Sequence, residues 1–170
     1  APAPAPLGRF VASGGSLPRG TISACWCHYA PAGAAALENG AYIALNQNER
    51  SDNAGTAISS RLGLTDARVL GNFLHDNAGD QLSVDLGTDL LISDNLIRTQ
   101  SAGVAITLKG VTRTEVVGNL LDRPSVTGVL LSNSGAIPST DVAISQNSIS
   151  AVAAVAPGGS TPVAIDLQAG

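Results

Sequence analysis

Apolar and polar residues alternate in a pattern that repeats along most of the chain. Each repeat holds short stretches in which every second residue is apolar, separated by turns that contain Asn or Gly. Alternation with a period of two is typical of β-strands, and no segment is long enough for an apolar face of helical period. Because stretches this short cannot bury a face alone, the pattern predicts an all-β solenoid of stacked coils.

Five asparagines set the length of the repeat. They recur at intervals of 24, 23, 24 and 28 residues, and each follows an apolar residue three positions earlier. A coil of this length with three short strands predicts a right-handed parallel β-helix of about six coils, since parallel crossovers are right-handed. The asparagines are Asn48, Asn72, Asn95, Asn119 and Asn147.

A glycine follows most of these asparagines and marks the next strand. The glycines are Gly55, Gly79, Gly103 and Gly128, with Pro162 in the last repeat. Three residues beyond each marker an apolar side chain recurs, and these are expected to align as Ile58, Leu82, Ile106, Leu131 and Ile165.

Four segments carry the repeat motif most clearly: Val69-Leu-Gly-Asn72-Phe-Leu74, Ile92-Ser-Asp-Asn95-Leu-Ile97, Val116-Val-Gly-Asn119-Leu-Leu121 and Gly103-Val-Ala-Ile106. This motif resembles the parallel β-helix repeats of the pectate-lyase-like superfamily, over about residues 42–170. The resemblance implies a single-stranded β-solenoid with an inward ladder of asparagines at one turn. It leaves function open, because that superfamily includes lyases, hydrolases, epimerases, phage tailspikes and inert surface proteins.

The repeat also divides the chain. Residues 1–8 are rich in Pro and Ala and are predicted to be a linker, within a chain expected to be a piece of something longer. Residues 9–40 are expected to hold a capping segment and a degenerate first coil. Residues 41–170 are expected to form the parallel β-helix itself.

Composition and charge narrow the functional classes. Aromatic residues make up 3% and charged residues 13% of the chain, which predicts a core of Leu, Ile, Val and Ala. The net charge is −4 and the basic residues do not cluster, so nucleic acid is not an expected partner. No apolar run approaches the roughly 20 residues that a membrane-spanning helix needs, so membrane insertion is not expected.

The strand after each glycine marker has an outer face where pectate-lyase-like enzymes usually carry their chemistry. Its residues two and four positions past the marker are mostly small or polar and include no pair of carboxylates for acid–base work. We therefore expect a non-catalytic face. The positions are Ala57, Gln81, Ala105, Leu130 and Ala164, then Ser59, Ser83, Thr107, Ser132 and Asp166.

The best candidates for chemistry lie three and four residues past the asparagines. His75, Arg98 and Asp122 are the candidate catalytic residues, and at one-coil spacing they are suited to an acidic sugar. An alternative interpretation is a charged rim that keeps this edge soluble. The candidate ligand-binding set is Asp52, His75, Asp76, Arg98, Asp122 and Arg123, in which Asp52 over Asp76 suggests a weak site for a cation such as calcium.

Two cysteines near the start lie one residue apart. Cys25, Cys27 and His28 suggest a metal, but a structural zinc site needs about four ligands and the sequence offers no second pair. We favour packing thiols and expect no metal or other cofactor apart from the weak calcium option.

A stripe of outward apolar residues predicts contact with another surface. The candidates are a second copy of the chain or the N-terminal segment folded back along the solenoid. The residues expected to form a self-interface are Leu70, Phe73, Leu96, Val117 and Leu120.

Together these features favour a non-catalytic module of an extracellular, cell-surface or phage-particle protein, acting as a rigid scaffold or a polysaccharide-contacting surface. One alternative is a fragment of a polysaccharide lyase, hydrolase or epimerase. Another is an oligomerisation stalk.

Overall fold

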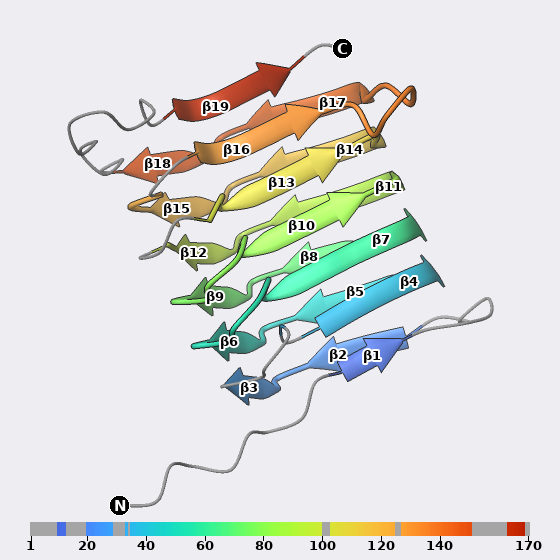
Figure 1. The fold of residues 1–170 in the computed structure, drawn as a ribbon. Helices are drawn as coiled ribbons and strands as arrows, with labels where there is room; N and C mark the ends of the chain where they lie inside the picture. Colours follow the sequence, from blue (N-terminus) through green and yellow to red (C-terminus); the bar gives the residue numbers. More distant parts are fainter. Residues whose placement is uncertain are drawn as a thin grey trace, which may run out of the picture.

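The computed structural model describes residues 10–12, 20–28, 33, 35–99, 103–124, 127–150 and 163–168. Every strand or helix assigned in these residues is a β-strand, which confirms the all-β prediction. The strands lie in three stacks, each coil contributing one strand to each stack, and the coils follow one another in chain order (Figure 1). No helix in these ranges is long and apolar enough to cross a membrane.

Three stacks of parallel strands make up the solenoid. The first holds β1 (Phe10–Ala12), β4 (Ala35–Ala41), β7 (Ile58–Thr65), β10 (Leu82–Asp85), β13 (Ile106–Lys109), β16 (Thr127–Ser132) and β19 (Val163–Gln168). The second holds β2 (Gly20–Ser23), β5 (Ile43–Asn46), β8 (Arg68–Leu70), β11 (Gly87–Ser93), β14 (Thr112–Val117) and β17 (Thr140–Ser145). The third holds β3 (Trp26–His28), β6 (Glu49–Ser51), β9 (Phe73–His75), β12 (Leu96–Arg98), β15 (Leu120–Asp122) and β18 (Ser148–Ser150).

Hydrogen bonding joins the first two stacks and leaves the third apart. Because β7 pairs with β11, the first and second stacks form one 13-stranded sheet, while the third stack is a separate 6-stranded sheet. The chain makes about five full turns between β3 and β18, close to the six coils expected.

The asparagine ladder is confirmed. The Nδ2 of Asn48, Asn72, Asn95 and Asn119 donates to the Oδ1 of the asparagine one coil later, each time at 2.9 Å. The same Oδ1 atoms accept a backbone N–H from the preceding coil. Nδ2 also donates to a backbone carbonyl of the coil before, so these buried amides are satisfied.

The turn before each ladder asparagine adopts the same backbone conformation in every repeat. The preceding residue has a positive φ in every repeat, a conformation that glycine adopts without strain and that the other residues adopt here as single turn positions. This bend turns the asparagine into the solenoid. The residues are Gln47, Gly71, Asp94, Gly118 and Gln146.

A second series of hydrogen-bonded, buried polar side chains was not predicted from the sequence. Asn53 Nδ2 donates to Asn77 Oδ1 at 2.6 Å, and Asn77 Nδ2 donates to Gln81 Oε1 at 2.6 Å. All three side chains are buried. The 24-residue interval between Asn53 and Asn77 was the available signal, but it spans only two coils.

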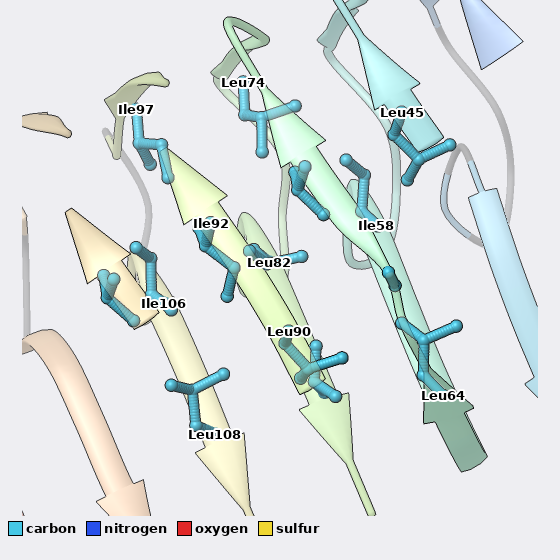
Figure 2. Close-up of a cluster of buried hydrophobic side chains, with 14 of the residues drawn as sticks. Leu45, Ile58, Leu64, Leu74, Leu82, Leu90, Ile92, Ile97, Ile106 and Leu108 are labelled. Atoms are coloured by element: carbon cyan, nitrogen blue, oxygen red, sulfur yellow. The ribbon is translucent and has the colours of Figure 1, made fainter. Parts of the chain in front are cut away.

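The core is a column of aliphatic side chains that runs through the coils (Figure 2). Leucine, isoleucine and valine from all three stacks meet at its centre, as the low aromatic content predicts. One inward position carries a charged residue in place of an aliphatic one, because Arg50 is only 2% exposed. The labelled members of the column are Leu45, Ile58, Leu64, Leu74, Leu82, Leu90, Ile92, Ile97, Ile106 and Leu108.

Two details of the first stack differ from expectation. Val129, rather than Leu131, pairs with both Ile106 and Ile165, so Gly128 lies two positions past the place of the other marker glycines. Val129 follows Asn119 by 10 residues, the same interval as from Asn48 to Ile58 and from Asn72 to Leu82, so the ladder asparagine locates this strand and Gly128 does not.

The second difference concerns the predicted outer face. Ala57, Gln81 and Ala105 are at most 1% exposed, and both alanines belong to the core. They precede the first residues of β7, β10 and β13, in a turn where the strand alternation of inward and outward positions does not yet apply. Thr107 is also buried, and its hydroxyl donates to Asp80 Oδ2 at 2.7 Å.

The ladder makes a prediction about stability. Asn95→Leu should lower the free energy of unfolding by about 1–3 kcal/mol, because Asn72 and Asn119 lose their buried partner. Urea unfolding followed by circular dichroism measures the change. Ser148→Leu is the matched control, since this exposed position is in register with Leu120 and should change stability by less than about 0.5 kcal/mol. Equal effects of the two substitutions would contradict the ladder's role.

Candidate functional site

The predicted column of charged residues lies at the ends of the third-stack strands. Ser51, His75, Arg98 and Asp122 pair in succession from β6 to β15, as the repeat spacing predicted. Ser150 continues the column in β18. The structure therefore places His75, Arg98 and Asp122 on successive coils.

His75 is held between two carboxylates. Its Nδ1 lies 2.8 Å from Asp76 Oδ2, and its Nε2 lies 3.4 Å from Glu49 Oε1. The imidazole also stacks on Phe73, with ring centroids 4.1 Å apart. Glu49 was not among the predicted residues, because it belongs to the column of Phe73 and reaches His75 across one coil. These contacts fix the orientation of the His75 ring and place a carboxylate proton acceptor, Asp76 or Glu49, at each ring nitrogen.

Arg98 and Asp122 form a separate ion pair. Arg98 Nε donates to Asp122 Oδ2 at 2.9 Å, and Arg123 Nε lies 3.5 Å from the same oxygen. The hydrogen bond from Arg98, reinforced by the charge of Arg123, holds the pKa of Asp122 below its usual value. Asp122 is therefore an ionised acceptor at neutral pH, and Arg98 already has a counter-charge.

The two aspartates proposed to share a cation bind different partners. Asp52 Oδ2 accepts a hydrogen bond from Ser51 Oγ at 2.8 Å, whereas Asp76 Oδ2 faces His75. Asp76 Oδ1 is buried and makes no hydrogen bond. Among the described residues, no group of three His, Cys, Asp or Glu side chains is arranged to hold a metal ion. The side chain of His28, suggested with Cys25 and Cys27, lies outside the described residues.

A groove of about 700 Å³ runs along the outer face of the second stack and was missed in the sequence analysis. One column of its wall crosses four coils in register, from Ala44 through Arg68 and Leu91 to Glu115. The complete lining is Gly20, Thr21, Tyr42, Ile43, Ala44, Asp66, Arg68, Asp89, Leu90, Leu91, Arg113 and Glu115.

Three of the charged side chains that line this groove, Asp66, Asp89 and Arg113, belong to a column of residues with positive φ. Six residues before each ladder asparagine lie Tyr42, Asp66, Asp89, Arg113 and Asp141, all with positive φ. This shared spacing was the signal that could have revealed the column. Arg113 binds Asp89 through two hydrogen bonds of 2.6 and 2.7 Å.

That contact sets the protonation of both groups. The hydrogen bond from Arg113 lowers the pKa of Asp89, and the same contact raises the pKa of Arg113. Both groups therefore stay charged at neutral pH. Arg68 is exposed and forms no ion pair with the described residues, so its guanidinium is available to a ligand.

Comparison with known proteins agrees with this architecture. The family model described as "right handed beta helix region" matches residues 8–154. The chain belongs to the right-handed β-helix family. A search of curated proteins found no match.

Solved structures share the fold of this β-helix. DFA-IIIase of Arthrobacter chlorophenolicus superimposes with a TM-score of 0.61 at 18% identity, covering 69% of this chain and 26% of that one. The A-module of the mannuronan C-5 epimerase AlgE6 of Azotobacter vinelandii gives a TM-score of 0.60 at 11% identity, covering 88% of this chain and 51% of that one. The β-helix described here thus spans about a quarter and about half of these two chains.

The predicted apolar stripe is only partly exposed in this β-helix. Leu120 is 42% exposed, while Leu70, Phe73, Leu96 and Val117 are half-buried. The column of Phe73, Leu96 and Leu120 is bounded by Glu49 at one end and Ser148 at the other. A self-interface through this stripe stays a prediction.

The edge column yields a prediction about titration. Arg98→Gln should raise the pKa of Asp122 toward the ordinary value of about 3.9, because it removes the main hydrogen-bond donor. NMR titration of the Asp122 carboxyl carbon measures the shift. Because the folded pKa is depressed, the pair stabilises the fold above the unfolded pKa, and that contribution is lost as pH falls through the folded pKa.

Arg123→Gln is the matched control for this titration. It removes only the weaker partner, so the pKa of Asp122 should rise less than in Arg98→Gln. A shift as large as that of Arg98→Gln would contradict the assignment of Arg98 as the dominant partner.

Proposed function

We propose that this β-helix is a non-catalytic module that binds a polysaccharide along the groove of the second stack, within an extracellular or surface protein. The observation that carries the proposal is the groove itself, which crosses several coils and combines an exposed tyrosine with charged side chains. A rigid solenoid is suited to this task because it holds its binding groups at a constant spacing.

The length of the groove fits an extended chain of sugars. Its lining begins at Gly20 in β2 and reaches Glu115 in β14, which are four coil-to-coil steps apart. At about 4.8 Å for each step, this corresponds to about 19 Å. A polymer lying along the coils would therefore meet a series of side chains rather than one pocket.

The chemistry of the groove suits hydroxyl-rich ligands. The Tyr42 side chain is 51% exposed and offers an apolar ring with a polar end. Carboxylates accept hydrogen bonds from sugar hydroxyls, and the guanidinium of Arg68 donates to sugar oxygens. Three acids (Asp66, Asp89 and Glu115) and two arginines (Arg68 and Arg113) line the groove, which favours a neutral over a polyanionic glycan.

The protonation states support binding without turnover. A carboxyl that donates a proton to a glycosidic oxygen needs a raised pKa. Two carboxyls have a clearly shifted pKa, Asp89 and Asp122, and in both the hydrogen bond from an arginine lowers the pKa. They are suited to accepting hydrogen bonds rather than to supplying protons.

A polysaccharide-modifying activity is the second candidate, and the arrangement of His75 favours it. His75 contacts both Glu49 and Asp76, so it has groups with which it can exchange a proton. Trp26, which is 70% exposed, pairs with Glu49 in the adjoining strand and presents a ring on which a sugar can stack. The two solved structures of similar fold are both named as enzymes.

Affinity electrophoresis tests binding in the groove. The protein should be retarded in gels that contain a neutral polysaccharide, tried as β-glucan, galactomannan and fructan, and less retarded by alginate or polygalacturonate. Tyr42→Ala and Arg68→Ala should each lower the affinity by about tenfold, the loss of one good contact. Arg61→Ala is the matched control, because Arg61 is exposed on β7, in another stack, and should leave binding unchanged.

Two outcomes would contradict this function. One is the absence of retardation by every neutral polysaccharide, and the other is an equal loss of binding in Arg61→Ala. Incubation with the same polymers tests the second candidate. Release of reducing ends or of unsaturated sugars, abolished by His75→Ala, would establish an enzyme and overturn the non-catalytic assignment.

A further inference from the structure

Two rows of side chains run along the groove of the second stack, each with one residue from each of four successive coils. The first row is Tyr42, Asp66, Asp89 and Arg113, and the second row is Ala44, Arg68, Leu91 and Glu115. In every coil one residue separates the two rows, and all four of these residues are buried: Ile43, Ala67, Leu90 and Thr114. Both rows therefore point outward, with a closed floor between them.

The spacing of the rows limits what can lie in the groove. It follows β5, β8, β11 and β14, which succeed one another along the second stack (Figure 1). Two residues along a strand separate the rows by about 6.6 Å, and neighbouring coils are about 4.8 Å apart. Over a length of about 19 Å, the volume of about 700 Å³ corresponds to a channel about 6–7 Å across. An α-helix, about 10–12 Å in diameter, is too wide, whereas a single unbranched chain of sugar rings fits.

The first two coils of the groove differ in the contacts that they offer. The coil of β5 presents the exposed ring of Tyr42 beside the methyl group of Ala44. The coil of β8 presents Asp66 and Arg68, which are both exposed and form no ion pair with the described residues. An apolar coil is thus followed by one whose hydrogen-bonding groups are open to a ligand.

The same contrast recurs in the next two coils. In the coil of β11, Leu91 is the more available group, because both carboxylate oxygens of Asp89 accept hydrogen bonds from Arg113. In the coil of β14, Arg113 is engaged in that contact, while Glu115 is exposed and forms no ion pair in the described part of the chain. Apolar and hydrogen-bonding contacts therefore alternate with a period of two coils, about 9.6 Å.

This period distinguishes among neutral glycans. In a β-1,4-linked chain of glucose or mannose, each sugar is turned over relative to the one before it, so the chain is extended and repeats every two sugars. Each sugar advances by about one coil spacing. The same edge of the sugar therefore returns to the same row at every second coil, where Arg68 and then Glu115 offer hydrogen bonds. Helical, compact or branched glycans do not have this repeat.

We propose that the groove binds an unbranched β-1,4-linked glucan or mannan parallel to the solenoid axis, with one sugar at each of four coils. Tyr42 stacks on the first sugar, and Asp66 and Arg68 bind hydroxyls of the second. Leu91 packs against the third sugar, and Glu115 accepts hydrogen bonds from the fourth. This inference rests on the proposed function and specifies the linkage and the orientation of its ligand.

Isothermal titration calorimetry with cello-oligosaccharides and manno-oligosaccharides of two to six sugars tests the number of sugars bound. In at least one of the two series the affinity should rise by about tenfold or more from two sugars to four, the gain from a further good contact. It should then change by less than about twofold up to six sugars, because the groove lining ends at Glu115. An affinity that is independent of length, or that keeps rising to six sugars, would overturn the four-sugar arrangement.

Tyr42→Ala tests where the chain lies on the coils. Because this variant lacks the contact with the first sugar, its affinity should stop rising at three sugars, whereas that of the wild type rises up to four. Arg61→Ala is the control, since Arg61 is exposed on β7 in another stack, and it should keep the wild-type dependence on length. An unchanged rise up to four sugars in Tyr42→Ala would refute the assignment of Tyr42 to the first sugar.

Leu91→Glu tests the second row while leaving Arg68 in place. The new carboxylate is in register with Arg68 one coil away and should pair with it, as opposite charges do elsewhere at this spacing. The affinity for the tetrasaccharide should fall by about tenfold, with an intact fold by circular dichroism. Ala143→Glu adds the same charge to the same row one coil beyond Glu115, outside the groove lining, and should leave the affinity unchanged. Equal losses in the two variants would contradict the arrangement.

Failure of this inference can be told apart from failure of the proposed function. If the linear β-1,4-linked oligosaccharides do not bind but a fructan retards the protein in affinity electrophoresis, polysaccharide binding stands and the β-1,4-linked ligand is ruled out. If no neutral glycan binds in either experiment, the proposed function fails and this inference fails with it.

Discussion

The hydrogen bond that passes from one asparagine amide to the next is the interaction on which this solenoid depends. Each ladder amide satisfies its neighbour and a backbone group, so a shift of one coil against the next would leave polar groups unpaired inside the core. The ladder therefore holds neighbouring coils at a constant register. Because register is constant, a residue at one place in the repeat always lies above its equivalent, and the properties of the protein are arranged as columns.

These columns explain why the outer faces differ in what they offer. At one-coil spacing opposite charges reach each other, and Arg98 pairs with Asp122 just as Arg113 pairs with Asp89. Charges in such pairs neutralise each other and are less available to a ligand. The groove of the second stack differs from the charged edge because Arg68 lies between Ala44 and Leu91, where no acid stands in register with it. A solenoid can thus neutralise some of its outward charges by ion pairs and leave others, such as Arg68, open to hydrogen-bonding ligands.

The same logic makes Arg50 conspicuous. A column position that is aliphatic in later coils carries a cation in the coil that pairs with β3, where the neighbour is Cys27. Arg50 is nevertheless buried, whereas the later coils place aliphatic residues at this position.

The sequence by itself determined the coil length, the ladder, the aliphatic core and the alignment of His75, Arg98 and Asp122. All of these follow from residues that recur at a constant interval. Only the tertiary structure decided that Ala57, Gln81 and Ala105 are buried, that Glu49 reaches His75, and that the second stack carries a groove. These features depend on how the chain bends at each turn and on how far a side chain reaches into the next coil. Repeat spacing carries no information about either, because both are set by packing in three dimensions.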